Sequence, residues 1–332
     1  MIFDPTISLR ELPLRMMRSV RVAVIGAGAM GSLFAAHFAE GGADVWAFDS
    51  WREHVDAIRR DGLRVDTGGK TRLVKIRATD NASKLAPVDV ALIMVKFGQT
   101  ASALAAAMPM IDRRTVIVTL QNGIGNVEAI RSLAPNNRIL FGLTSLTCEM
   151  LGPGRIEASY HGQGETYFWP VDGRADEDCV AIADLLSRGG IHTTLAPDIE
   201  VQIWKKLVVN CCYNPLCAIT GLSVGELVDR PEIWPVLDGI TEEIVAAAHH
   251  KGIPLQRDDA GRFLRQVGVE ARTHLPSMLI DVRRRRDTEI DCLNGAVVRE
   301  CERGAIAATF NRAIVDIVHG IETHWRTQAG QQ

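Results

Sequence analysis

The sequence predicts an α/β fold in which a doubly wound parallel sheet is followed by an all-α part. Two patterns lead to this expectation. In the first half of the chain, short apolar segments typical of buried strands alternate with segments of helical periodicity, as in parallel sheets with crossover helices. After Pro197 the strand pattern disappears and helical periodicity continues almost to the end of the chain. We therefore expect two domains, with a ligand cleft between them.

The predicted elements alternate along the chain. Strands are expected at residues 20–25, 44–48, 88–95, 116–120 and 139–143. Helices are expected at 30–40, 52–60, 100–108, 126–133 and 178–187. The segment 152–168 is glycine-rich and compatible with further strands. In the second half, the expected helices include 240–250, closed by Gly252, and 311–325.

These patterns divide the chain into three parts. Residues 1–18 are expected to be an extension that is either poorly ordered or precedes a later start, because Met16 and Met17 lie just before the first strand. Residues 19–196 are expected to form the sheet domain and residues 197–326 the helical domain.

Composition limits the classes of protein and partner. The 332 residues are 47% hydrophobic and 23% charged, as in ordinary globular proteins. A net charge of −3 argues against binding to nucleic acid or a membrane surface, and no apolar run approaches the roughly 20 residues of a membrane span. The seven cysteines show no metal-binding spacing and are expected to be reduced thiols. A cytoplasmic protein without a metal is expected, and a homodimer is compatible with the sequence.

A glycine motif follows the first predicted strand. Gly26 suits a tight turn, Gly28 lets the backbone approach a pyrophosphate, and Gly31 lets the next helix pack against the strand. The amides at the start of that helix then point at phosphate oxygens. The motif predicts a Rossmann-type dinucleotide site, although a purely structural turn is the alternative. The residues expected to bind the cofactor here are Gly26, Ala27, Gly28, Ala29, Met30 and Gly31.

Polar side chains also follow three later strands. Asp49 comes 18 residues after Gly31, where an acid that binds the ribose is expected. Lys96 and Asn122 follow the next buried strands, at the sheet edge where ligands bind in open α/β folds. Taken alone, Lys96 could be a solvated lysine and Asn122-Gly123 a simple turn. Together they indicate one site.

A polar stripe marks the first helix of the second half. Lys206, Asn210 and Asn214 recur every four residues within an apolar sequence, so they share one helix face. Such a stripe facing apolar neighbours is costly unless partners or a ligand satisfy it, although a solvent-exposed face is the alternative. Because Pro215 cannot donate to the carbonyl of Cys211, we expect the helix to bend or end near Asn214.

A second polar pair lies further along the chain. Ser277 and Glu289 are twelve residues apart and converge only if the helix between them breaks. Asp287 or Thr288 would then cap a new helix and place Glu289 in its first turn. The run Arg283–Arg286 is expected to be a solvated face, with phosphate binding as the weaker alternative.

From residue 20 to about residue 311, the chain resembles the ketopantoate reductases. The resemblance rests on Gly26-Ala-Gly-Ala-Met-Gly31, Val95-Lys96, Gln121-Asn-Gly-Ile-Gly125, Trp204-Lys-Lys-Leu207 with Asn210 and Asn214, Ser277-Met-Leu-Ile-Asp281, and Thr288-Glu-Ile-Asp291 with Asn294-Gly295. It implies reduction of the 2-keto acid ketopantoate to pantoate, usually with NADPH. It also implies that Lys206 is the general acid and Glu289 its partner. The resemblance further implies that the substrate is bound by Asn210, Asn214 and Ser277. It also implies that Lys96 and Asn122 lie where the cofactor meets the substrate.

The chain departs from the family pattern in two places. Asp49 would repel the 2′-phosphate of NADPH and suits the free hydroxyl of NADH, and only a folded-back Arg52 would offset this. The segment 305–311 lacks the prolines usual in the family. NADPH and NADH therefore both stay open as cofactors. A paralogous dehydrogenase for another 2-oxo or hydroxy acid is the alternative function, and a non-catalytic nucleotide sensor is disfavoured because sensing needs no proton donor.

Overall fold

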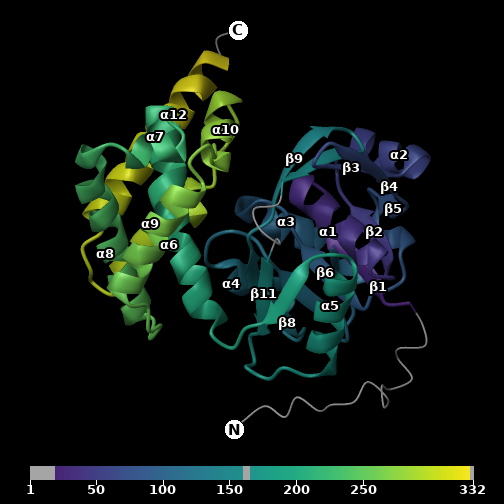
Figure 1. The fold of residues 1–332 in the computed structure, drawn as a ribbon. Helices are drawn as coiled ribbons and strands as arrows, with labels where there is room; N and C mark the ends of the chain where they lie inside the picture. Colours follow the sequence, from purple (N-terminus) through teal and green to yellow (C-terminus); the bar gives the residue numbers. More distant parts are fainter. Residues whose placement is uncertain (1–18, 160–164, 330–332) are drawn as a thin grey trace.

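The computed structural model describes residues 19–159 and 165–329. The predicted extension at residues 1–18 lies outside the described residues. Two parts lie side by side: a sheet part built from the first half of the chain and a helical part built from the second (Figure 1). The predicted fold class, a Rossmann-type sheet followed by an all-α region, is confirmed.

The main sheet has eight strands in the order β12-β11-β8-β7-β6-β1-β2-β5. All neighbouring pairs are parallel except β11 and β8. The strands are β1 (Arg21–Ile25), β2 (Asp44–Phe48), β5 (Arg77–Thr79), β6 (Val90–Ile93), β7 (Val116–Thr119), β8 (Ile139–Thr144), β11 (Glu165–Pro170) and β12 (His192–Leu195). The chain passes from β1 to β2 on one side and returns to β6 on the other, which makes the ends of β1 and β6 a topological switch point.

A second, smaller sheet was not predicted. It has four strands in the order β4-β3-β10-β9. They are β3 (Leu63–Thr67), β4 (Lys70–Val74), β9 (Thr147–Gly152) and β10 (Arg155–Ser159). Helix α1 (Ala29–Glu40) contacts this sheet as well as β1 and β2 of the main sheet. Its residues from Gly31 to Phe38 are all buried, as expected for a helix covered on both sides.

The other helices of the first half follow the predicted ranges within about two residues. They are α2 (Arg52–Asp61), α3 (Thr100–Ala107), α4 (Asn126–Leu133) and α5 (Glu177–Arg188). Side chains from α3 and α4, including Leu104 and Ile130, belong to the core on one side of the main sheet, while α1 and α5 contribute to the core on the other side.

The helical part has its own core. Its helices are α6 (Ile199–Thr220), α7 (Val224–Val228), α8 (Trp234–His250), α9 (Arg257–Glu270), α10 (Ser277–Arg283), α11 (Asn294–Arg303) and α12 (Thr309–Ala329). The long helix α6 contributes buried side chains such as Trp204 and Tyr213 to this core and lies against the sheet part at its beginning (Figure 1). No helix in the described ranges is long and apolar enough to cross a membrane.

Of the two outcomes predicted at Pro215, an end of α6 near Asn214 is wrong, while a bend there stays a prediction. The helix continues through Pro215 to Thr220 and is closed by Gly221 in the left-handed conformation (φ 76°). Apolar side chains on both sides of the proline, among them Cys211 and Leu216, are buried in the helical core. Tertiary packing therefore outweighs the local preference of proline to end a helix.

Candidate active site

Five loops meet at the carboxyl edge of the parallel strands. The glycine motif follows β1, Asp49 follows β2, and Lys96 follows β6 after two residues. Asn122 follows β7, and Thr144 is the last residue of β8. Because parallel strands place their carboxyl ends at one edge, the predicted cofactor residues share that edge.

The glycine motif has the local geometry that a dinucleotide requires. Gly26 has a positive φ of 89°, and a Cβ there would lie 2.4 Å from Val95 Cγ1. A Cβ on Gly31 would lie 1.9 Å from the carbonyl oxygen of Gly26. In contrast, a Cβ on Gly28 would meet nothing within 4 Å. Gly28 also precedes α1 without a side-chain cap or an acidic residue in the first turn, so the helix amides stay available for an anion.

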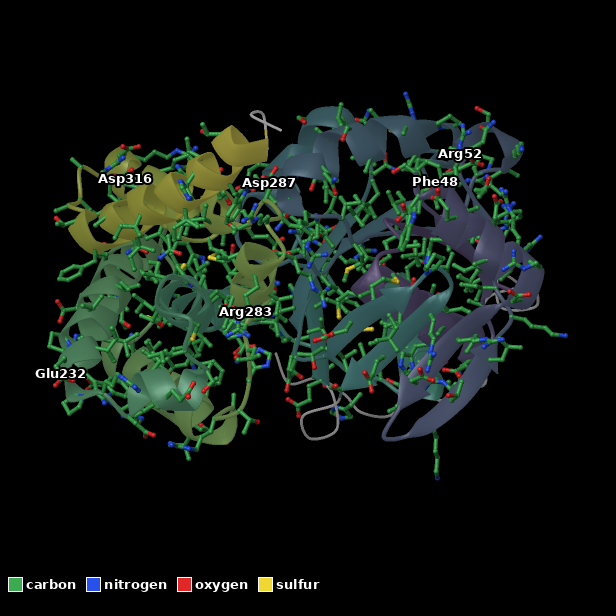
Figure 2. The ribbon with its side chains drawn as sticks, turned by 90° about the horizontal axis from the view of Figure 1, so that it is seen from above. Phe48, Arg52, Glu232, Arg283, Asp287 and Asp316 are labelled. Atoms are coloured by element: carbon green, nitrogen blue, oxygen red, sulfur yellow. The ribbon has the colours of Figure 1, made fainter. Side chains whose placement is uncertain are left out.

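The loop after β2 places Asp49 beside an exposed aromatic residue. The Asp49 carboxylate accepts a hydrogen bond from the amide of Trp51 (2.8 Å), and the Trp51 ring stacks on His54 with 5.2 Å between ring centroids. Arg52 lies 3.5 Å from Asp80 and is exposed to solvent. Figure 2 shows Arg52 and Phe48 in the sheet part, with Asp287 on the side of the helical part that faces it.

Lys206 reaches from α6 to the ends of β7 and β8. Its Nζ donates to Asn122 Oδ1 (2.9 Å) and to the carbonyl oxygen of Thr144 (2.8 Å). Burial of the ammonium group lowers the pKa of Lys206 to about 8, and the nearby charge of Glu289 partly opposes that shift. The side chain is therefore mostly protonated at neutral pH but close to the point at which it releases its proton.

Asn122 connects Lys206 with Glu289. Its Oδ1 accepts from Lys206, and its side chain is also hydrogen-bonded to the Glu289 carboxylate. Burial raises the pKa of Glu289, while Lys96 and the Asn122 bond act in the opposite direction. The three residues come from α6, the loop after β7 and the segment before α11, so the two parts of the molecule meet at this cluster.

The break predicted between Ser277 and Glu289 is present, but the predicted cap is wrong in detail. Helix α10 ends at Arg283, and Arg285 adopts a left-handed conformation (φ 52°). Glu289 precedes a single 3-10 turn, Ile290–Cys292, rather than lying in the first turn of an α-helix. The Thr288 hydroxyl accepts from the amide of Ile290 (3.2 Å) and stabilises this short turn locally.

The remaining predicted substrate residues lie on α6 and α10. Asn210 and Asn214 follow Lys206 at four-residue intervals on the uninterrupted helix α6 and are half-buried. Ser277 is the exposed first residue of α10, which packs against α6. Within the described ranges, the side chains of these three residues make no hydrogen bond, so their polar groups are available to a ligand.

Lys96 is paired across the two parts of the molecule. Its Nζ lies 2.8 Å from Asp281 Oδ2 and donates to the carbonyl oxygen of Asp287 (2.7 Å). Asp281 is almost fully buried and also pairs with Arg286 (2.9 Å). The run Arg283–Arg286 is exposed to solvent, and its last residue, Arg286, also pairs with Asp281, the partner of Lys96.

Sequence reasoning assigned no role to Asp281 or to the Thr144 carbonyl. Asp281 lies one helical turn after Ser277, and that spacing could have indicated a shared face. A backbone carbonyl such as that of Thr144 leaves no trace in the sequence, because every residue has one.

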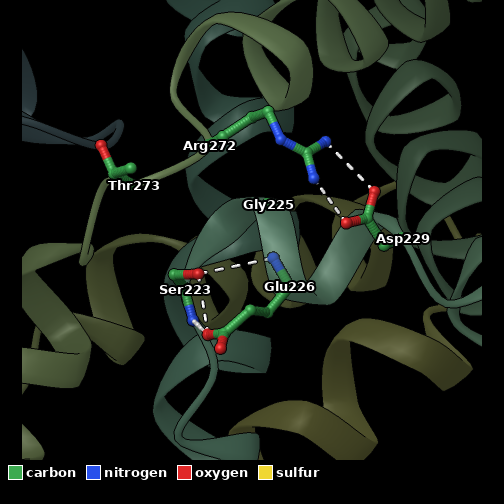
Figure 3. A pocket seen from close by; sticks show the side chains of 6 residues that line it. All are labelled: Ser223, Gly225, Glu226, Asp229, Arg272 and Thr273. Carbon is green, nitrogen blue, oxygen red and sulfur yellow. Dashed lines mark hydrogen bonds and ion pairs between the residues drawn. The ribbon is translucent and has the colours of Figure 1, made fainter.

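A surface pocket in the helical part lies apart from this cluster. It is lined by Ser223, Gly225, Glu226, Asp229, Arg272 and Thr273 (Figure 3). Its polar groups already bind one another: Ser223 and Glu226 form the capping box of α7, and Arg272 pairs with Asp229. The pocket therefore offers few free polar groups to a ligand.

Comparisons with known proteins agree with the geometry. The sequence profile of the family described as "Ketopantoate reductase PanE/ApbA" matches residues 22–173, and its C-terminal counterpart matches residues 198–322. The 2-dehydropantoate 2-reductase of Streptococcus pyogenes serotype M3 is 31% identical over 302 residues, which are 91% of this chain and 97% of that protein. The Archaeoglobus fulgidus protein of the same name is 32% identical over 92% of this chain and 99% of its own.

Two solved structures are also similar. A ketopantoate reductase of Ralstonia eutropha JMP134 superposes with a TM-score of 0.85 at 30% identity and covers 92% of this chain and 100% of its own. A D-mandelate dehydrogenase, solved with NADH and anilino(oxo)acetate, superposes with a TM-score of 0.83 at 28% identity, covering 92% and 99% of the two chains.

Proposed function

The chain belongs to the ketopantoate reductase family, and we propose that it reduces the ketone of 2-dehydropantoate to the alcohol of pantoate. It is an oxidoreductase that uses a nicotinamide cofactor. The observation that carries the proposal is the cluster of Lys206, Asn122 and Glu289, where an ammonium group meets the carboxyl edge of the sheet. In this assignment residues 19–196 bind the cofactor and residues 197–326 supply most of the substrate groups.

The glycine motif and Asp49 would hold the cofactor. The open space around Gly28 and the uncapped start of α1 fit a pyrophosphate, and the bound nicotinamide would supply the hydride. The carboxylate of Asp49 favours the free ribose hydroxyls of NADH over a 2′-phosphate. We therefore assign NADH as the preferred donor, and the NADH-bound mandelate dehydrogenase gives this choice a precedent.

Lys206 would be the general acid. Reduction of a ketone builds negative charge on its oxygen, and a protonated ammonium group beside that oxygen stabilises the charge and then donates the proton. The hydrogen bonds to Asn122 and to the Thr144 carbonyl fix the position of the Lys206 Nζ from the sheet side. A pKa of about 8 suits a donor that must be charged before the reaction and neutral after it.

Glu289 and Asn122 would keep this donor charged and oriented. The carboxylate of Glu289 favours the protonated form of Lys206, and Asn122 links the two side chains. Asn210, Asn214 and Ser277 would hold the substrate through their free amide and hydroxyl groups. Lys96 would lie where the cofactor meets the substrate, held from the helical part by Asp281.

A direct assay separates the two candidate substrates. Oxidation of NADH and of NADPH is followed at 340 nm with ketopantoate and, in parallel, with phenylglyoxylate, the keto acid that corresponds to mandelate. We expect kcat/KM for ketopantoate to exceed that for phenylglyoxylate by at least tenfold. The reverse order would favour a mandelate-type dehydrogenase, to which the similar NADH-bound structure points.

Asp49 gives a test of the cofactor assignment. Replacement by Ser removes the charge that opposes a 2′-phosphate, so the ratio of kcat/KM for NADH to that for NADPH should fall about tenfold or more. Asp80→Ser is the matched control, because Asp80 pairs with Arg52 but is not at the end of β2. A wild-type preference for NADPH that Asp49→Ser leaves unchanged would contradict the assignment.

A further inference from the structure

Helix α6 contains a gap in its hydrogen bonding directly beside the predicted substrate residues. Pro215 lies inside the helix and has no amide hydrogen to donate to the carbonyl oxygen of Cys211. Cys211 is completely buried, so water does not reach this oxygen from the surface. Asn210 and Asn214 each lie one residue before the two ends of the gap. The local geometry here therefore sets where both amide side chains point.

A side chain from another helix fills the gap. Asn294, the first residue of α11, donates from Nδ2 to the carbonyl oxygen of Cys211 (3.0 Å). The same Nδ2 donates its second hydrogen to Asn311 Oδ1 (3.0 Å). Both asparagines are fully buried. Because both hydrogens of Nδ2 have acceptors, the orientation of the Asn294 amide is fixed by its partners.

Asn311 is in turn held by Glu243 of α8. The Asn311 Nδ2 and its backbone amide donate to Glu243 Oε2 at 2.7 and 2.9 Å. The amide of Phe310 donates to Glu243 Oε1 (2.8 Å), so this carboxylate also satisfies amides at the start of α12. One hydrogen-bond network, buried at Asn294 and Asn311, thus connects α6, α8, α11 and α12.

We propose that Asn294 is a positioning residue that holds the substrate-binding face of α6 in register by replacing the hydrogen bond that Pro215 removes. This inference rests on the proposed function, because it assumes that Asn210 and Asn214 bind the substrate. Without the Asn294 amide, the Cys211 carbonyl would be a buried acceptor without a donor, and α6 would shift to relieve it. Such a shift would misplace Asn210 and Asn214 relative to Lys206, which is anchored on the sheet side.

The test is a double-mutant cycle with Asn294→Ala and Pro215→Ala. An alanine at position 215 restores an amide hydrogen for Cys211, so it should make the Asn294 bond to Cys211 dispensable. The Asn294 bond to Asn311 is lost in both backgrounds and cancels from the coupling. We expect Asn294→Ala alone to lower kcat/KM for ketopantoate about tenfold or more, mainly through KM. In the Pro215→Ala background, the same substitution should cost less than threefold. The Kd for NADH, measured by fluorescence, should stay within twofold in all four proteins.

Asn137→Ala is the matched control for general destabilisation. Asn137 also donates from Nδ2 to two backbone carbonyls, those of Asp112 (2.7 Å) and Thr115 (2.9 Å), but it lies in the sheet part away from α6. It should lower the Tm without raising KM for ketopantoate. If the single variant Asn294→Ala fails to fold while the double variant Asn294→Ala/Pro215→Ala folds and reduces ketopantoate, this result supports the proposal.

Several results would overturn the proposal. They are an equal kinetic loss on Asn294→Ala in both backgrounds, a loss of Tm without any change in KM or kcat, and failure of both Asn294→Ala proteins to fold. Wild-type protein that does not reduce ketopantoate would instead overturn the proposed substrate. The cycle would then be measured with phenylglyoxylate, and, if this is not reduced either, the coupling in Tm alone would decide whether Asn294 replaces the missing bond.

Discussion

The pKa of Lys206 is set by burial and by the charge of Glu289, which act in opposite directions. Burial disfavours the ammonium form, the charge of Glu289 favours it, and Asn122 and the Thr144 carbonyl accept its hydrogens. The net result is a pKa of about 8, within reach of physiological pH. A lysine in water, with a pKa near 10.4, would be a weaker acid and would donate its proton less readily.

Replacement of Lys206 by Ala should leave a folded protein that binds cofactor but has lost most of its turnover. We expect kcat to fall by a factor of about 10² to 10⁴, the usual contribution of a general acid. Lys205→Ala is the control, because its side chain points about 100° away around the helix. Steady-state rates with ketopantoate measure both, and equal losses in the two variants would mean that Lys206 is not the donor.

The pH dependence of the reaction follows from the same pKa. The donor must be protonated, so kcat/KM should fall as the pH rises through about 8. Glu289 raises the pKa of Lys206, so Glu289→Gln should move this falling limb to lower pH and reduce kcat/KM at pH 7. Rates from pH 6 to 10 test this in both proteins. If kcat/KM of Glu289→Gln falls at the same pH as that of the wild type, the charge of Glu289 does not act on Lys206.

Single residues of the site were predictable where a side chain carries the chemistry. The spacing of Lys206, Asn210 and Asn214 on one helix is a property of the sequence, and the unbroken α6 keeps it. The bridge that Asn122 makes to Lys206 joins residues 84 positions apart, and no local pattern encodes such a contact. The same holds for Lys96 and Asp281, which are 185 positions apart.

At the level of elements, two glycines in the turn between β1 and α1 differ in the space that a Cβ atom would have. A Cβ on Gly31 would overlap the Gly26 carbonyl, whereas a Cβ on Gly28 would enter open space. Gly28→Ala should therefore fold with a Tm near that of the wild type but weaken NADH binding about tenfold, since the new methyl group occupies the place of the pyrophosphate. Gly31→Ala should lose both NADH affinity and thermal stability. Thermal melts and fluorescence titration with NADH distinguish them, and unchanged NADH binding by Gly28→Ala would place the pyrophosphate elsewhere.

Elements buried on both faces were predicted best. Strands such as β6 and β7 are continuous apolar runs, which the sequence shows clearly. The small sheet was missed because β4, with the sequence Lys-Thr-Arg-Leu-Val, is mostly exposed and lacks an apolar run. β4 pairs with its neighbour in sequence, β3. β3 pairs on its other side with β10 from a distant part of the chain, so that pairing depends on tertiary contacts rather than local propensity.

At the scale of the whole molecule, the two parts approach closely at Gly123. A Cβ there would lie 2.3 Å from the carbonyl oxygen of Cys292 in the helical part. Gly123→Ala should push the parts away from each other and lower kcat/KM for ketopantoate at least tenfold, with a smaller effect on the Kd for NADH. Gly125→Ala is a matched control, because Gly125 also has a positive φ (97°) but its nearest neighbour is 3.5 Å away. Equal kinetic losses in the two variants would trace the effect to backbone strain instead of the interface.

The position of α1 between the two sheets has a consequence for biosynthesis. The strands that cover its outer side include β9, which begins at Thr147, more than a hundred residues after α1 ends. During translation the apolar side chains of α1, among them Phe34 and Phe38, leave the ribosome long before β9 and β10 are made, although β3 and β4 of the same sheet follow much sooner. The apolar surface of α1 that β9 and β10 cover in the folded protein therefore stays exposed for several seconds of synthesis at ordinary elongation rates.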